Sequence, residues 1–157
     1  MPPDRSRYSA ENCSIRRTLD VVGEKWTLLV LREAFYGVRR FDDFARGVGC
    51  ARNILSARLH TLVEEELLRR EPYREPGQRS RVEYRLTDKG LELFPVVVAL
   101  MQWGDRWAVD PEGPPVEITH RDCGEPVAVT MTCAAGHGPL TARDTEAVPG
   151  AGARLVA

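Results

Sequence analysis

The sequence of 157 residues lacks several features that would assign it to a well-defined class of protein. It has no run of about 18 apolar residues, so no segment is expected to span a membrane. Its first residues, Met1-Pro2-Pro3-Asp4-Arg5, lack the apolar stretch of a secretory signal, and we therefore expect a cytoplasmic protein. Neither a phosphate-binding glycine loop nor a Gly-x-Ser-x-Gly nucleophile sequence occurs, so we expect neither an enzyme nor a required cofactor.

Cysteine is scarce, with four residues in the chain: Cys13, Cys50, Cys123 and Cys133. In a protein expected in the cytoplasm, such residues are thiols, metal ligands or redox sensors rather than members of structural disulfides. Disulfides are therefore not expected to hold the fold together, and we expect Cys50 to be a small packed residue.

An excess of positive charge is also missing, because the formal net charge is −1. The charges are nevertheless unevenly distributed. Residues 1–110 contain 19 Lys and Arg against 17 Asp and Glu, whereas residues 111–157 contain 3 against 6. Lysine is almost absent, since 20 of the 22 basic residues are arginine, which suits bidentate contacts with phosphate and guanine but also accompanies a GC-rich genome. The N-terminal part can therefore bind nucleic acid despite the overall charge.

The spacing of apolar residues predicts several helices in the first part of the chain. The predicted helices cover residues 13–22, 24–36, 41–46 and 52–66, with a glycine-containing turn at 47–50. The fourth helix carries its apolar residues on one face and small or polar residues on the other. Between Phe44 and Val63 there are three arginines and no acidic residue.

A β-hairpin and a long helix are predicted to follow. Alternation of apolar and polar residues predicts strands over 67–73 and 82–86 around a turn at 75–78. Thr87 caps a long helix that runs to about residue 109, in which Pro95 favours a kink. The fold class is therefore α+β and mainly α, in the order of a winged helix-turn-helix domain followed by a long dimerisation helix.

The chain is predicted to comprise four parts. These are an N-terminal arm (1–11), the winged helix-turn-helix domain with its dimerisation helix (12–109), a small β-hairpin extension (110–141) and a disordered tail (142–157). The extension begins with a proline-rich linker, and its apolar residues alternate as in two short strands around residues 122–126. The tail is rich in Gly and Ala and has too few apolar residues to form a core.

The predicted helix over 52–66 and the hairpin are the parts expected to contact double-stranded DNA. The second helix of a helix-turn-helix enters the major groove, where Arg, Asn, Ser and His bond base edges, and a wing holds the backbone. The candidate DNA-binding residues are Arg39, Arg40, Arg52, Asn53, Ser56, Ala57, Arg58, His60, Arg74, Arg79 and Arg81. A merely solvated helix face is the alternative for the helical residues, and an ion pair with Glu64 or Glu65 is the alternative for Arg58.

Several separated segments resemble, in order, the HxlR family of winged-helix regulators. These segments are Asn12–Ile15, Leu19–Thr27, Leu28–Arg32, Gly37–Phe41, Asn53–Leu59 and Val82–Gly90. The resemblance covers about residues 8–107, so the acidic segment after Asp110 goes beyond the family's core. It implies a homodimeric transcriptional regulator, most simply a repressor, that binds a pseudo-palindromic operator. It also implies dimer contacts through the first helix and the long helix after the wing.

Large apolar residues lie on more than one side of the predicted long helix, which needs more cover than a small domain provides. The residues read as core and dimer interface are Trp26, Phe35, Leu93, Val97, Trp103 and Trp107. A hydrophobic pocket for a small apolar effector between these helices is the alternative.

Cys13 is a candidate redox sensor because it lies at a predicted helix start with Arg16 and Arg17 close by. A helix N-terminus and nearby cations both favour the reactive thiolate. Some members of the family are similar in using a cysteine at this place to sense oxidants or electrophiles. A buried, inert cysteine is the alternative.

His120-x-x-Cys123 and Cys133-x-x-x-His137 form the second constellation. Two such pairs on facing strand ends would give a tetrahedral Cys2His2 zinc site and would stabilise an extension that has little core of its own. The spacing differs from a double Cys-x-x-Cys site, because Gly136 stands where a further cysteine would be. The alternative is a small strand pair without metal.

Overall fold

A computed structural model of the protein describes residues 4–156, which form two compact units. The winged-helix unit consists of residues 18–97, and the terminal unit consists of residues 4–17 together with 98–156. Two helices, α1 (Ser14–Val22) and α6 (Phe94–Trp107), run across the boundaries between them. No helix in the described part of the chain is long and apolar enough to cross a membrane.

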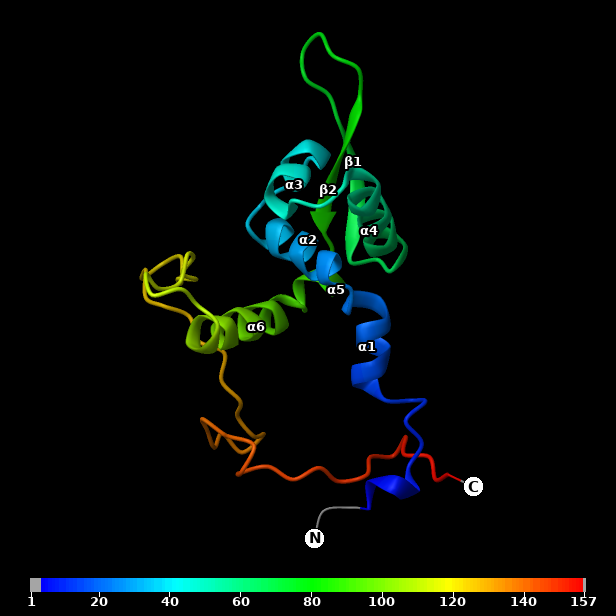
Figure 1. Ribbon diagram of the computed structural model, residues 1–157, viewed down its shortest axis with the longest axis vertical. Helices are drawn as coiled ribbons and strands as arrows, with labels where there is room; N and C mark the ends of the chain where they lie inside the picture. The colour runs from blue at the N-terminus through cyan, green and yellow to red at the C-terminus, as the bar shows by residue number, and fades with distance from the viewer. Residues whose placement is uncertain (1–3, 157) are drawn as a thin grey trace. The chain divides into compact units, whose positions relative to one another are not determined.

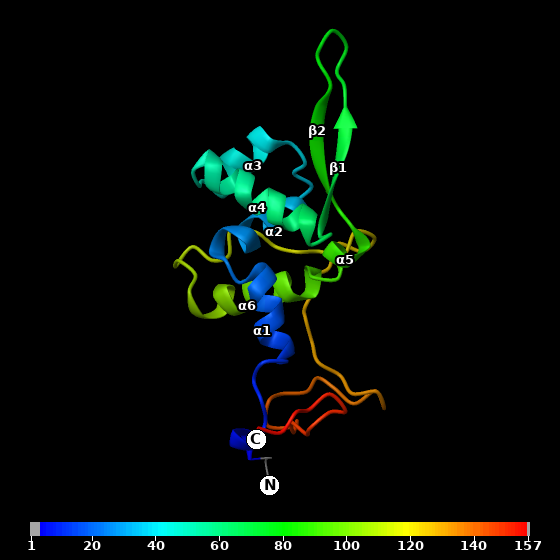
Figure 2. The same ribbon diagram turned by 90° about the vertical axis from the view of Figure 1, so that its right-hand side faces the viewer.

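The winged-helix unit contains three helices followed by a β-hairpin (Figure 1). Its elements are α2 (Lys25–Phe35), α3 (Phe41–Val48), α4 (Arg52–Glu64), β1 (Leu68–Tyr73), β2 (Arg81–Leu86) and the short α5 (Asp88–Leu91). The strands are antiparallel, in a register that pairs Leu68 with Leu86 and Tyr73 with Arg81. Figure 2 shows the tip of this hairpin reaching beyond α3 and α4. The predicted fold class, α+β and mainly α, is confirmed.

The core of the winged-helix unit lies between α2, α3, α4 and the start of β1. Its fully buried side chains are Thr27, Val30, Leu31, Phe44, Leu55, Leu59, Leu62 and Leu68. In α4 the buried residues recur every third or fourth position, so one stripe of the helix faces the core and the opposite face is exposed.

The turn between α3 and α4 depends on Gly49. This residue is the C-cap of α3 and adopts a left-handed conformation with φ of 71°, which glycine reaches without steric cost. Gly47, predicted to lie in the turn, belongs to α3 instead. A Cβ atom there would lie 2.4 Å from Oε2 of Glu33, so α3 packs closely on α2 at this point.

The predicted helix over residues 88–109 is divided in two, because the helix is interrupted just before Pro95, where a kink is predicted. α5 ends at Leu91 and α6 begins at Phe94. Pro95 explains the break, since proline has no N–H to donate and its ring clashes with the carbonyl group four residues earlier, here that of Leu91. Proline is tolerated in a first helical turn, which is where Pro95 lies in α6.

The extension after α6 forms two separate turns rather than two regular strands. Single antiparallel bridges close them, between Thr119 and Pro126 and between Met131 and Leu140. Among the described residues beyond Val98, none is buried, so the extension has no core that would support longer strands.

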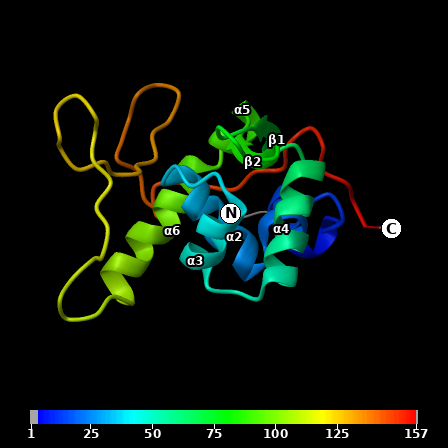
Figure 3. The same ribbon diagram turned by 90° about the horizontal axis from the view of Figure 1, so that it is seen from above.

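The tail, predicted to be disordered, pairs with the N-terminal arm. The amide of Ser9 donates to the carbonyl of Arg154 over 2.8 Å, and the amide of Val156 donates to the carbonyl of Arg7 over 3.0 Å. The side chain of Asn12 adds a bond of 2.6 Å to the carbonyl of Gly152. Figure 3 shows the same structure from above. The bonds of Ser9 and Val156 join main-chain groups, so they leave no pattern of side chains by which the sequence could reveal them.

Candidate nucleic-acid interface

The exposed face of α4 carries most of the residues predicted to read DNA. Leu55, Leu59 and Leu62 point into the core, so the opposite face of α4 points outward. The predicted residues Arg52, Asn53, Ser56, Ala57 and His60 are all exposed on that face. Their side chains are short or flexible, so the helix backbone can approach the edges of bases in a groove.

Arg58 is the exception on α4, because it is half-buried. Its Nη1 atom lies 3.9 Å from Oε2 of Glu24, and its Nε atom is buried without a hydrogen-bond partner among the described residues. Neither Glu64 nor Glu65 is its partner, so the predicted alternative pairing is wrong. Glu64 instead lies 3.2 Å from Nε2 of His60, one helical turn away.

Arg39 and Arg40 lie in an extended segment that is bonded to the hairpin. The amide of Tyr84 donates to the carbonyl of Arg39 over 2.8 Å, and Arg40 forms an antiparallel bridge with Glu83. This attachment, which sequence reasoning missed, holds the start of α3 against β2.

Arg40 and Arg52 are each held by one carboxylate and one aromatic ring. Nη2 of Arg40 lies 2.8 Å from Oε1 of Glu75, and its guanidinium lies 4.6 Å from the centre of the Tyr73 ring. Partial desolvation lowers the pKa of Arg40, but the charges of Glu75 and Tyr73 outweigh it and hold this pKa above its ordinary value.

Arg52 repeats this arrangement at the start of α4. Its Nη2 atom lies 2.9 Å from Oδ1 of Asp42, and its guanidinium lies 4.7 Å from the centre of the Phe41 ring. Asp42, Phe41, Tyr73 and Glu75 were not predicted as site residues, because a sequence does not reveal which acid will approach which arginine.

These two arginines line a polar hollow of about 450 Å³, which we call the arginine hollow. Its lining residues are Arg40, Phe41, Asp42, Asp43, Arg52, Tyr73, Arg81 and Val82. They come from the segment before α3, from α3, from α4 and from both strands of the hairpin. The hollow thus brings together arginines that lie far apart in the sequence.

The tip of the hairpin carries the other predicted arginines. Arg74, Arg79 and Arg81 are exposed, and Nε of Arg74 donates to the carbonyl of Gln78 across the turn. Arg79 and Arg81 form no ion pair within the described part of the chain, so their charges stay available to an anion.

The strands below the tip are joined by a network of charged residues. The register places Arg69 opposite Arg85 and Glu71 opposite Glu83, so opposite charges meet diagonally or along one strand. Glu71 lies 2.7 Å from both Arg69 and Arg85, and Arg85 lies 2.6 Å from Glu83. The hydrogen bond from Arg69, followed by the charge of Arg85, holds the pKa of Glu71 below its ordinary value.

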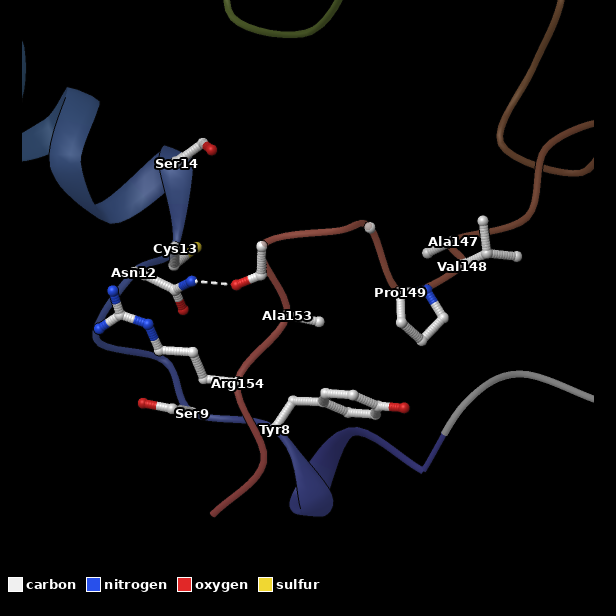
Figure 4. A pocket seen from close by; sticks show the side chains of 12 residues that line it. Tyr8, Ser9, Asn12, Cys13, Ser14, Ala147, Val148, Pro149, Ala153 and Arg154 are labelled. Carbon is white, nitrogen blue, oxygen red and sulfur yellow. Dashed lines mark hydrogen bonds between the residues drawn. The ribbon is translucent and has the colours of Figure 1, made fainter.

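Cys13 precedes α1 in the terminal unit and is half-buried. It lines a hollow of about 370 Å³ between the N-terminal arm and the tail, which we call the Cys13 pocket. Figure 4 shows Tyr8, Pro149 and Ala153 around this pocket, with Asn12 bonded to the tail beside Cys13. Cys50, by contrast, packs against the core of the winged-helix unit, as expected.

The four predicted metal ligands form two pairs. Nδ1 of His120 lies 3.2 Å from Sγ of Cys123, and Nδ1 of His137 lies 3.4 Å from Sγ of Cys133. The two turns that carry these pairs are separate in Figure 1, where they are coloured yellow and orange. Within residues 4–156 no three potential metal-binding side chains are grouped together. The expected facing arrangement of the two pairs is therefore not formed.

The sequence matches the model of the HxlR-like helix-turn-helix family over residues 21–112. An HTH-type transcriptional regulator of Mycobacterium tuberculosis (strain ATCC 25618 / H37Rv) is 48% identical over 146 residues, which cover 93% of this chain and 90% of the relative. The matched family and its named relatives are transcriptional regulators rather than enzymes, as predicted.

Solved structures give the same result. The structure of PA1607, a candidate transcription factor, is 41% identical, has a TM-score of 0.78, and covers 88% of this chain and 96% of its own. The reduced form of the redox regulator HypR is 31% identical, has a TM-score of 0.53, and covers 59% of this chain and 90% of its own. The first of these likenesses extends through most of the segment after residue 110, whereas the second is confined to a smaller part of the chain.

Replacing Glu71 with Gln should weaken the dependence of stability on pH. A carboxylate with a depressed pKa stabilises the folded state above its unfolded pKa, near 4.5, and this contribution is lost as the pH falls through the lower folded value. The fall in thermal unfolding midpoint between neutral pH and about pH 3 should therefore be smaller in the variant than in the wild type. Glu92→Gln, which removes an exposed carboxylate outside this network, serves as the control. An equal pH dependence in wild type and Glu71→Gln would contradict the assignment.

Proposed function

The chain belongs to the HxlR-like helix-turn-helix family, and from this we propose that it represses transcription by binding operator DNA as a homodimer. α4 enters the major groove and contacts bases, while the hairpin arginines contact the backbone. The observation that carries the proposal is the exposed polar face of α4 beside a hairpin whose tip bears Arg74, Arg79 and Arg81. Such a protein acts in the cytoplasm, where the chromosome of a bacterium lies.

Base contacts and backbone contacts have separate roles in this proposal. Arg52, Asn53, Ser56 and His60 bond base edges directly or through water, and each well-formed bidentate contact is worth about 1–3 kcal/mol of discrimination. Arg39, Arg40 and the arginines of the hairpin tip bind phosphates, which gives affinity and register but no sequence selection. Arg58 supports α4 from the side instead, because Glu24 is its nearest acid.

Homodimer formation is supported by apolar side chains that α1 and α6 leave exposed. Ile15 is 72% exposed, Trp103 is 65% exposed and Trp107 is 70% exposed. Exposed aromatic and aliphatic groups of this size are usual at protein interfaces, where Trp is enriched. A second copy of the chain covers them and places two α4 helices on successive half-sites of a two-fold operator.

Control of DNA binding is proposed to act at Cys13. The similarity to HypR, a named redox regulator, supports this role, as does the position of Cys13 in a pocket at the start of α1. Oxidation of the thiol, or a small apolar effector bound at the dimer interface, alters the contacts of α1 and so the dimer. A single structural zinc held by His120, Cys123, Cys133 and His137 is proposed as well, which requires the two turns to approach each other.

Arg52→Ala and Ser56→Ala should each weaken binding to a duplex that covers the upstream region of the protein's own gene. The expected loss is about 5- to 150-fold per base contact removed, as measured by fluorescence anisotropy at fixed salt. Arg143→Ala, which removes an exposed arginine from the tail, is the matched control and should bind as the wild type does. Unchanged affinity in both α4 variants would show that another surface reads the DNA.

Trp103→Glu should convert the dimer to a monomer, because a carboxylate cannot be buried in an apolar interface without a partner. Sedimentation velocity gives the mass directly, and circular dichroism shows whether the variant is folded. Val116→Glu introduces the same charge outside the two helices and should remain dimeric. The dimer proposal is refuted if the wild type sediments as a monomer at concentrations where it binds DNA.

Treatment with diamide should release the wild-type protein from its duplex and leave Cys13→Ser bound. The sulfur of Cys13 is the atom oxidised: it forms a disulfide with a second thiol while diamide takes up the two electrons and two protons, so removing the Cys13 thiol removes the response. Cys133→Ser, which lacks a different thiol, should still respond to diamide. An equal response in Cys13→Ser and wild type would assign sensing to another cysteine.

Elemental analysis of the purified protein should find about one zinc per chain, and a chelator should lower the unfolding midpoint. Cys123→Ser should lose the metal, whereas Cys50→Ser should keep it because Cys50 packs in another unit. Protein without bound metal, and with a melting curve indifferent to chelator, would end the zinc proposal.

A further inference from the structure

Two arginines that line the arginine hollow, Arg40 and Arg52, are held in the same arrangement, although Glu75, the carboxylate beside Arg40, is not itself a lining residue. In each copy an arginine lies with its flat guanidinium near an aromatic ring and with one edge on a carboxylate: Arg40 with Tyr73 and Glu75, and Arg52 with Phe41 and Asp42. The members come from separate parts of the chain, since Arg52 and Asp42 are ten residues apart and Arg40 and Glu75 are further apart still. The repetition distinguishes the hollow from a chance pair of surface charges.

The aromatic rings and the carboxylates interact with different parts of the guanidinium groups. A ring attracts a cation through its face, and so holds the plane of the guanidinium without using its N–H donors. The carboxylate uses donors at one edge, and it can be replaced there by another oxyanion of similar geometry. Each arginine is therefore fixed in direction while its anionic partner remains exchangeable.

Exchange is inexpensive because all four charged groups are accessible to water. The side chains of Arg52 and Asp42 are 68% and 63% exposed, and those of Arg40 and Glu75 are 48% and 38% exposed. Ion pairs between exposed groups contribute little free energy, so little is lost when a competing anion displaces the carboxylate from its arginine. Arg81, on the same hollow, forms no ion pair within the described residues and attracts such an anion from the start.

We propose that, on DNA outside the operator, the arginine hollow binds a backbone phosphate, and that Asp42 and Glu75 weaken this binding by competing for Arg52 and Arg40. On the operator, Arg52 leaves the phosphate and bonds a base edge. This inference rests on the proposed function, since it concerns the same DNA. A phosphodiester group carries the charge and the paired oxygens that a guanidinium edge accepts, and the hollow of about 450 Å³ has room for it. Asp43 also lines the hollow, but it is paired with Arg46 on the same helix.

The competition acts on all DNA, whatever its sequence. Contacts with phosphates supply nearly all of the affinity for non-specific DNA. Acids that compete with phosphates therefore lower this affinity by a larger share than the affinity for the operator. Base contacts from α4 then decide whether, on a given DNA site, phosphate oxygens replace the carboxylates beside the arginines. The carboxylates thus raise the ratio of specific to non-specific binding at the expense of total affinity, and that ratio is what matters in a genome.

Asp42→Asn and Glu75→Gln test the proposal, because each amide keeps the shape of the side chain and removes its charge. The probe is a mixed-sequence duplex about three helical turns long, followed by fluorescence anisotropy over a series of salt concentrations. Each variant should bind this duplex up to about fivefold more tightly than the wild type at low salt, the factor that corresponds to an exposed ion pair. The gain should shrink as salt screens the phosphates.

Two controls separate competition from a general change of charge. Glu92→Gln makes the same change in net charge outside the hollow and should bind as the wild type does. Asp42→Asn should give no gain in an Arg52→Ala background, because the arginine for which Asp42 competes is then absent. Unfolding midpoints close to that of the wild type show that the variants are folded.

The outcomes distinguish this inference from the proposed function. If the wild type binds the duplex in a salt-dependent way and both amide variants bind no better than Glu92→Gln, the competition is disproved while DNA binding stands. A gain for Asp42→Asn that persists in the Arg52→Ala background also disproves it. If the wild type binds neither this duplex nor the upstream duplex of its own gene at low salt, the proposed function fails and this inference fails with it.

Discussion

The burial of one face of α4 is the interaction on which the candidate site depends. Leu55, Leu59 and Leu62 have no exposed surface, and they fix the helix at a single rotation about its axis. A rotation of one residue would move about 100° of the helical circumference and would carry polar side chains into the core. The same packing that stabilises the winged-helix unit therefore also decides which side chains of α4 face outward, so the stability of the unit and the composition of its exposed face share one cause.

Much of this arrangement could be predicted from the sequence, because apolar periodicity reports directly which face is buried. The helices at 24–36 and 52–66, the hairpin and the exposed residues of α4 all follow from it. At Pro95 the sequence predicts a kink and the structure has a break, because the apolar residues on either side continue the helical spacing and mask the interruption. Periodicity reports the positions of apolar side chains, and it does not report that proline lacks the main-chain N–H group that a helix needs.

Contacts that periodicity does not govern could not be predicted. The pairing of Arg52 with Asp42 and of Arg40 with Glu75 depends on where the loops bring exposed groups together. The bonds between Ser9, Arg154, Arg7 and Val156 join main-chain atoms in segments that have no apolar pattern. The terminal unit shows the limit clearly, because beyond Val98 no described residue is buried and the pairing of the arm with the tail rests on main-chain hydrogen bonds that almost any sequence can make.

The attachment of the segment before α3 to β2 has a mechanical consequence. The amide of Tyr84 donates to the carbonyl of Arg39, and Arg40 forms a bridge with Glu83, so the hairpin and the first turn of α3 are held together. α3 in turn leads through Gly49 into α4, with no flexible linker between them. The hairpin and the start of α3 are therefore joined through main-chain atoms, and substitution of their side chains does not remove this link.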